Sequence, residues 1–218
     1  MSELLFNELP RPTFRWLRVN HTVSSLAGED TAVQSIAVEA NKDILSPLPV
    51  GTALLDGNYE GANKEAVHVL VEKAEGYAIN VPPKAKEVVG IRIDANARVA
   101  NRFQFIVGEG AELEVQFYVT GSGDALTNVS YLNEYDVKEA GKVVVKKVNL
   151  LPEHVQHIEH RYTKLEEKAD VEYINIEIGG SENILNYYHD LVGQESRMVH
   201  DIAYLGNKEQ KFDISMVM

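Results

Sequence analysis

Short β-prone segments recur along most of this chain, and Gly, Asn, Asp or Pro separates each from the next. From the segment EVVGIRI onward their centres lie roughly every 12 to 16 residues, an even spacing typical of an all-β domain. This rhythm predicts a mainly β fold. The expected strands run from AVHVLVE at 66–72 to KFDISMVM at 211–218.

Two of these segments show a clear period-2 alternation of apolar and polar residues, the pattern of a strand with one buried and one solvent-facing side. We therefore expect their apolar sets to lie in the core. The apolar sets are Leu113, Val115, Phe117 and Val119 in the first segment, and Ile174, Ile176 and Ile178, alternating with Asn175 and Glu177, in the second.

Two architectures fit a series of evenly spaced strands: a sandwich or barrel, and a parallel solenoid. Turn-like glycines occur at 108–110 and 179–181, but no Asn-Gly or Asp-Gly pair of the kind that closes tight hairpins joins two of the later strands. Repeated apolar faces at even spacing suit stacked rungs, each of which buries its face on its neighbours. Spacing alone leaves both architectures open.

The first part of the chain has a different character. Residues 1–64 are expected to form a mixed N-terminal segment and residues 65–218 the β domain. Within the first segment, residues 31–39 fit a strand or a helix, and residues 45–65 are rich in turn residues and indicate a loop or linker.

Composition excludes several classes of function. The formal net charge of −12 disfavours a nucleic-acid partner, because an acidic surface repels phosphate groups. The sequence has no cysteine, so it offers no disulfide, no thiolate nucleophile and no Cys-ligated metal. No segment has the apolar length of a membrane span or of a signal peptide, and we expect a cytoplasmic protein without a membrane partner.

Three histidines at a spacing of three, His154, His157 and His160, invite a metal interpretation. On a strand, however, odd spacing places His157 on the face opposite to the other two. The other two would lie roughly 20 Å apart. We therefore expect a structural role for all three. The charged stretch 161–168 that follows is expected to be a solvated connection.

Two His-Asp pairs, His189-Asp190 and His200-Asp201, follow eleven residues apart. If successive strands stack, these histidines come close together, and we take His189 and His200 as candidate metal-binding residues. In each pair the two side chains point to opposite faces of the strand. No nucleotide-binding loop, nucleophile elbow or catalytic carboxylate pair stands out, and no catalytic residue is assigned.

Several segments, in order, resemble the SufB/SufD family of iron–sulfur cluster assembly proteins. The resemblance covers about 140 residues and is carried by their order and spacing, with a weaker match near the N-terminus. The segments are GYAINVPPKAKEVVGIRI at 76–93, RFQFIVGEGAELEVQFYVTG at 102–121, HVQHIEHRYTKLEEKADVEYINIEIGG at 154–180, the following stretch 183–215, and PRPTFRWLRVN at 10–20.

This resemblance implies a right-handed parallel β-helix that acts as a scaffold, not as an enzyme, together with a SufB-type protein and the SufC ABC-type ATPase. A homodimer is an alternative to the SufB-type partner. Since SufB-type members carry a Cys and this sequence has none, the resemblance is closer to SufD. No cofactor is expected to bind tightly to this chain alone, and an iron–sulfur cluster is expected only in the assembled complex.

The sequence stops in the middle of an expected strand, before the further rungs and C-terminal helices that the resemblance implies, which indicates a short or C-terminally truncated relative. The family's functional positions in that region have no counterpart here. The last expected strand would leave an open edge for a partner. Its candidate contact residues are Phe212, Ile214, Met216 and Met218.

Two other functions remain open from the sequence. A purely structural solenoid that dimerises would share the same pattern, but would not bind a SufB-type protein or the ATPase. A carbohydrate-active β-helix enzyme would need a groove of Asp, Arg and Lys on one face, and such enzymes are commonly secreted.

Overall fold

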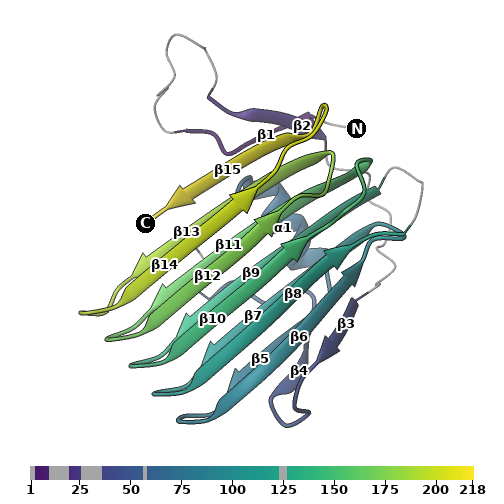
Figure 1. Ribbon diagram of the computed structural model, residues 1–218. Helices are drawn as coiled ribbons and strands as arrows, with labels where there is room; N and C mark the ends of the chain where they lie inside the picture. Colours follow the sequence, from purple (N-terminus) through teal and green to yellow (C-terminus); the bar gives the residue numbers. More distant parts are fainter. Residues whose placement is uncertain (1–2, 10–19, 26–35, 56–57, 123–126) are drawn as a thin grey trace.

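The chain forms a two-sheet β-solenoid in which each turn contributes one strand to each sheet (Figure 1). The structure is a computed structural model and describes residues 3–9, 20–25, 36–55, 58–122 and 127–218. Five consecutive strand pairs, from β5 and β6 to β13 and β14, make about five turns, and β15 follows them. The solenoid expectation is therefore confirmed and the sandwich is excluded. The right-handedness of the coil stays a prediction.

All strand pairs between successive turns are parallel, and antiparallel strands cover the first turn. The six-stranded sheet consists of β14 (Arg197–Tyr204), β12 (Asp170–Glu177), β10 (Lys142–Asn149), β8 (Glu112–Thr120), β6 (Lys86–Asp94) and the antiparallel β3 (Ile36–Glu39).

The seven-stranded sheet lies opposite, and a separate two-stranded ribbon lies beside its last strand (Figure 1). Its strands are β15 (Lys211–Val217), β13 (Glu182–Leu191), β11 (Val155–Leu165), β9 (Thr127–Val137), β7 (Val99–Val107), β5 (Gly76–Val81) and the antiparallel β4 (Leu45–Leu48), and the ribbon pairs β1 (Glu3–Phe6) with β2 (Thr22–Ser25).

One column of paired residues shows the length of each turn. Val81, Val107, Val137, Leu165 and Leu191 are successive partners, with separations of 26, 30, 28 and 26 residues. Since the side-chain period of a strand is two, this register keeps the inward side chains of every turn aligned with those of the next. The solenoid interior, which we call the lumen, is built from these columns.

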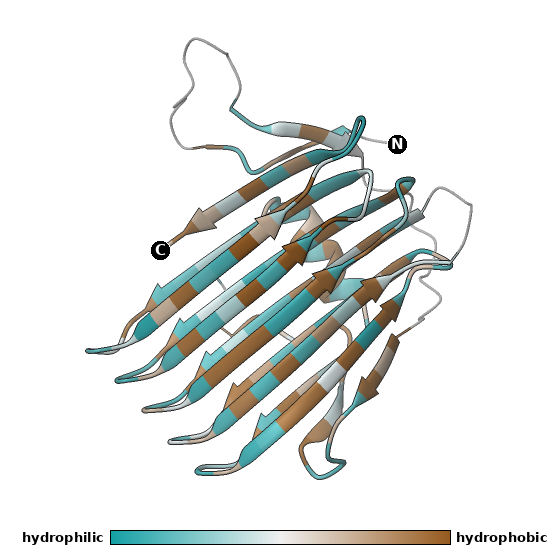
Figure 2. Ribbon diagram, viewed as in Figure 1, coloured by the Kyte–Doolittle hydropathy of each residue, from teal (hydrophilic) through white to brown (hydrophobic). Residues whose placement is uncertain are grey.

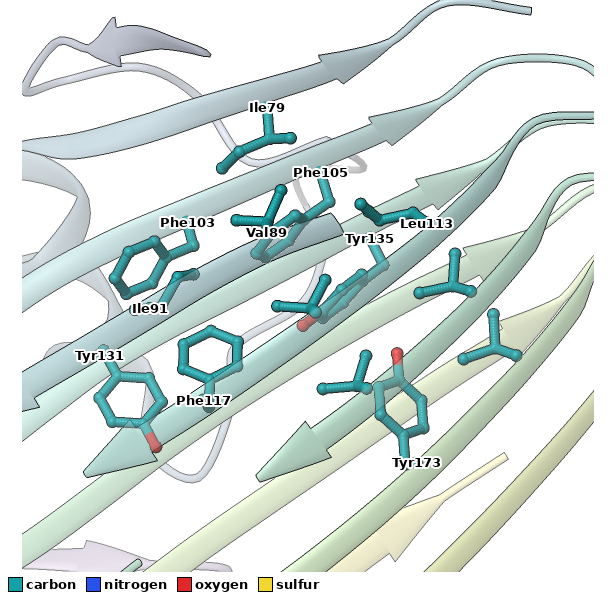
Figure 3. Close-up of a cluster of buried hydrophobic side chains, with 14 of the residues drawn as sticks. Ile79, Val89, Ile91, Phe103, Phe105, Leu113, Phe117, Tyr131, Tyr135 and Tyr173 are labelled. Atoms are coloured by element: carbon teal, nitrogen blue, oxygen red, sulfur yellow. The ribbon is translucent and has the colours of Figure 1, made fainter. Parts of the chain in front are cut away.

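The first half of the lumen is apolar and aromatic (Figure 3). Phe105 stacks on Tyr135 of the next turn at 4.5 Å between ring centroids, and Phe117 contacts Phe103 edge to face at 5.5 Å. The inward set predicted for 112–120 is buried, and apolar and polar residues alternate along the strands (Figure 2). Burial of such aromatic side chains supplies much of the hydrophobic stabilisation of a core.

The alternation predicted for residues 170–178 is inverted in the structure. Asn175 and Glu177 are buried in the lumen, whereas Ile176 and Ile178 are 38% and 41% exposed on the outside. The prediction was wrong because it assumed that the apolar face turns inward. In this turn the polar side chains form hydrogen bonds and ion pairs within the lumen. The strand therefore keeps the register of its neighbours, and its isoleucines lie on the outer face.

The segment AVHVLVE, predicted as the first strand, is instead part of the helix α1 (Lys64–Lys73). The side chain of Asn63 caps this helix by accepting from the backbone N–H of Ala66. The buried Ala66, Val67 and Leu70 follow helical spacing and pack over the outer face of the seven-stranded sheet, near β7 and β9. Tertiary packing thus overrides the β preference of the valines.

The segment 45–65, predicted as a loop or linker, also contains structure. Leu45–Leu48 forms β4, which pairs antiparallel with β5. Tyr59 and Ala62 are buried, and residues 36–39 form a strand, one of the two possibilities for 31–39. Residues 10–19, which carry most of the N-terminal resemblance, lie outside the described residues, and the boundary at residue 64 stays a prediction.

Tight turns stack along one end of the solenoid and place one residue per turn in the left-handed backbone region. Backbone N–H groups of Gly110, Ala140 and Lys168 each donate to a carbonyl of the next turn at 2.8–2.9 Å. Gly110 has φ +61° and Ala140 φ +54°, so the same position is filled by glycine in one turn and alanine in the next. A residue with a Cβ is strained in this region.

We predict that Ala140→Gly stabilises the protein by about 0.5–1 kcal/mol, because glycine removes the left-handed strain but adds freedom to the unfolded chain. The matched change Gly110→Ala introduces the same left-handed strain and should destabilise the protein by a similar amount. The added Cβ would meet only Lys84 Cγ, at 3.7 Å, so no steric clash adds to this strain. Urea unfolding measures both. Changes of the same sign in the two variants would contradict the prediction.

Candidate functional site in the solenoid interior

The lumen changes from apolar to polar along the solenoid axis. In one column of the six-stranded sheet, Ile91 and Phe117 are followed by Lys147 and Asn175. In the facing sheet, Phe103 is followed by polar side chains of the next two turns in the same way. The polar part of the lumen therefore begins where β9, β10 and β11 meet, and it is the candidate functional site.

Four buried charges form the centre of this site. Lys147 Nζ lies 2.5 Å from Glu159 Oε2 and 2.6 Å from Glu177 Oε1, and Arg161 Nη2 donates to Glu159 Oε1 at 2.6 Å. All four side chains have no exposed surface. Two cations and two carboxylates are thus enclosed together, an arrangement in which each charge has an opposite partner, as burial requires.

The two carboxylates have different electrostatic environments. Burial alone would raise the pKa of Glu159, but Arg161 and Lys147 outweigh it and hold this pKa well below its usual range. For Glu177, burial dominates and raises the pKa, because Lys147 is its only close cation among the described residues. Glu159 is therefore the fixed anion of the network.

Arg161 is further held between two aromatic rings. Its guanidinium carbon lies 4.4 Å from the ring centroids of both Tyr173 and Tyr187, which come from opposite sheets. Such cation–π contacts are stronger when the cation is removed from water. The stretch 161–168 was expected to be a solvated connection. That expectation was wrong for its first half, since β11 continues to Leu165 and only the residues after it form the turn.

The three closely spaced histidines do not form a metal site. His157 faces the lumen, where Nε2 lies 3.0 Å from the Tyr131 hydroxyl. His160 faces outward, and its Nδ1 accepts from the backbone N–H of Ala62 at 3.0 Å. His157 and His160 thus lie on opposite faces of β11, as predicted, whereas His154 lies in the turn just before this strand. Burial lowers the pKa of His157, with Lys147 adding to the effect, to about 3, and burial lowers that of His160 to about 4.

His189 and His200 are brought together, with 5.6 Å between their ring centroids. They lie on β13 and β14, the facing strands of one turn, so they meet across the lumen and not along one sheet. His189 is buried and His200 partly buried, while Asp201 is exposed on the opposite face of its strand. Among the described residues, no group of three or more His, Asp or Glu side chains is arranged to hold a metal ion.

The candidate partner residues lie at the end of the solenoid. Phe212, Ile214 and Met216 pair with the lumen-facing Asn183, Leu185 and Tyr187 of β13, and therefore share their inward direction. Met218, just after the strand, is 79% exposed. On the outward face of the same strand, Asp213 accepts a hydrogen bond from Asn7 at 3.0 Å, which attaches the β1–β2 ribbon.

Sequence reasoning missed the charged network. Its signal was present as polar residues two apart in three segments on consecutive strands, about half a turn from each other: Lys147 and Asn149, then Glu159, Arg161 and Thr163, then Asn175 and Glu177. Each set alternates with residues on the opposite face of its strand. Once the length of a turn is known, this alternation predicts that the polar residues align in one continuous column.

Comparison with known proteins fits this architecture. Residues 91–218, more than half of the chain, match the family model described as SUF system FeS cluster assembly, SufBD core domain. The chain belongs to this family. No curated protein and no solved structure matches it. The SufBD core match begins within β6 and covers every residue of the charged network.

Membership of the SufBD core family confirms the resemblance seen in the sequence and places the chain in SUF-type iron–sulfur cluster assembly. This family consists of assembly scaffold proteins. In the described part of the chain, no helix combines the length and apolar character needed to cross a bilayer.

We predict that Glu159→Gln destabilises the SufBD core by about 3–5 kcal/mol, because it leaves the buried Lys147 and Arg161 without their shared anion. The control Glu114→Gln, on β8, removes the carboxylate of a surface ion pair with Lys146 of β10 and should change stability little. Urea unfolding of both variants checks this. Equal losses in the two variants would show that the network does not stabilise the fold.

The buried histidines predict a loss of stability in acid. Their folded pKa values lie below the unfolded value near 6.5, so the unfolded chain binds protons that the folded chain does not as the pH falls below that value. Stability should be unaffected by these groups above about pH 7 and fall by up to about 1.4 kcal/mol per pH unit for each imidazole below pH 6.

This can be measured as the urea midpoint between about pH 8 and pH 4, a window that reaches the folded pKa of His160. His160→Gln keeps an acceptor for the Ala62 N–H but removes one titrating group, so its profile should be shallower than that of the wild type. Replacement of the exposed His68 by Gln is the control and should leave the slope unchanged. Parallel profiles for all three proteins would contradict the assignment.

Proposed function

We propose that this chain is a SufD-like scaffold subunit of a SUF-type iron–sulfur cluster assembly complex, acting with a SufB-type protein and a SufC-type ABC ATPase. The observation that carries the proposal is a SufBD core solenoid without a cysteine. With no thiolate in its sequence, the chain supplies no Cys ligand for a cluster and no sulfur carrier. These roles belong to the partner.

The charged lumen supports a scaffold role. Its charged groups pair with one another: Glu159 forms ion pairs with Lys147 and Arg161, and Glu177 forms an ion pair with Lys147. Such groups hold the turns in a fixed arrangement. We infer that the chain alone catalyses no reaction, that ATP hydrolysis belongs to the SufC-type partner, that a cluster is held only in the assembled complex, and that the complex acts in the cytoplasm.

The proposed contact with the SufB-type partner is the end of the solenoid at β15. This strand is the outermost of the seven-stranded sheet among the described residues, so one side of its backbone is available to another strand. Met216 and Val217 are 38% and 44% exposed there, and Phe212 and Ile214 are partly buried. The surface combines free backbone groups with apolar side chains, which suits strand addition.

Co-purification tests the proposal. The chain, co-expressed with a SufB-type and a SufC-type protein, should retain both. Met216→Lys places a charge at the proposed contact and should reduce retention of the SufB-type protein at least about tenfold, since an unpaired charge at an interface is costly. Val88→Lys, at a site 58% exposed on β6, is the matched control and should retain both partners.

If the unmodified chain retains neither protein, the assembly role proposed here is wrong. If light scattering then shows a dimer of this chain that Met216→Lys dissociates, the end of the solenoid joins two copies and the SufB-type partner is replaced by a homodimer. Equal retention by Met216→Lys and Val88→Lys would contradict the proposed contact alone.

A further inference from the structure

The polar lumen contains a second cluster that the charged network does not use. His189 of β13 and His200 of β14 face each other across the last complete strand pair, beside Asn175, Tyr173 and Tyr187. His189 is 1% exposed, yet neither of its ring nitrogens has a hydrogen-bond partner. Nδ1 of His200 is also unpartnered. These ring nitrogens are therefore free to bind a ligand within the lumen.

The distance between the rings fits a shared metal ion. An imidazole nitrogen binds zinc at about 2.1 Å, which places each ring centroid about 3.2 Å from the ion and two centroids about 5.3 Å apart at the tetrahedral angle. The observed separation is 5.6 Å, with the ring planes at 78°. The separation of the two rings is therefore close to that of two imidazoles that share one ion.

Asn175 fixes the orientation of one ring. Its side-chain amide lies 2.9 Å from His200 Nε2, so Nδ1 is the atom of this imidazole that remains free for a ligand. Metal-binding histidines are usually held in this way, with the second nitrogen engaged by a neighbouring polar group. After rotation of the amide, the Asn175 oxygen can accept from Nε2–H while Nδ1 binds the ion.

The surroundings keep both imidazoles neutral, the form in which histidine binds a metal ion. Burial, with Arg161 adding to the effect, lowers the pKa of His189 to about 3 and that of His200 to about 2, so neither carries a proton at neutral pH. The positive charge of Arg161 is itself countered by Glu159, which accepts from Arg161 Nε and Nη2 at 3.0 and 2.6 Å. The partial exposure of His200 gives the site a route to solvent.

We propose that His189 and His200 form a binding site for one divalent first-row transition-metal ion, with Nδ1 of His200 and a ring nitrogen of His189 as ligands and water in the remaining positions. Imidazole ligands select such ions over Mg²⁺ or Ca²⁺. The site belongs to this chain alone, so it is independent of the proposed partners and its test does not require them.

The purified full chain, freed of metal by a chelator, is titrated with Co²⁺ and followed by visible absorption and calorimetry. We expect one ion per chain. His189→Asn and His200→Asn should each weaken binding by about tenfold or more, and the double variant should lose the stoichiometric site. His68→Asn, at an exposed position of α1, is the matched control and should bind as the wild type does.

A second measurement needs no substitution in the site. In a chain labelled with ¹⁵N at histidine, one equivalent of Zn²⁺ should shift the signals of two of the seven imidazoles together. No stoichiometric Co²⁺ binding by the wild type, unchanged binding by the folded double variant, or a zinc response from one imidazole or none would each overturn the proposal and indicate that water fills this part of the lumen.

Discussion

Every part of this molecule depends on parallel, in-register stacking of successive turns. A turn uses 26 to 30 residues, and variation in the length of its connections leaves the pairing of its strands unchanged. Because a shift by one residue would exchange the two faces of a strand, this register decides which side chains enter the lumen. The stacked turns, with their backbone hydrogen bonds from one turn to the next, maintain it.

The buried charges are a consequence of that register and also enforce it. Transfer of four ionised groups from water into a protein interior costs several kcal/mol for each ion unless opposite charges and hydrogen bonds offset it. Lys147, Glu159 and Glu177 come from β10, β11 and β12, so their contacts form only when those strands are correctly aligned. A displaced strand would leave a charge without a partner, which disfavours other registers.

The N-terminal segment completes the other side of the seven-stranded sheet. The outward-facing Arg102 and Glu134 are buried as a pair because the carbonyl of Thr52 and the N–H of Leu55 bond to them. The Tyr59 hydroxyl donates a hydrogen bond to Asn186 Oδ1, and the backbone N–H of Ala62 donates one to His160 Nδ1. A segment that looks like a linker in sequence thus forms the cover of the solenoid, since the polar groups beneath it need its backbone as partner.

The sequence by itself determined the mainly β class, the even spacing of the later strands, the alternation in 112–120 and the likeness to the SufB/SufD family. These follow from local patterns that each segment carries alone. It could not decide that 66–72 is helical or that Ile176 faces outward, because both depend on what packs against the segment. Likewise, Lys147, Glu159 and Arg161, or His189 and His200, become neighbours only through the length of each turn. That length joins residues from different strands, and it is a property of the tertiary structure.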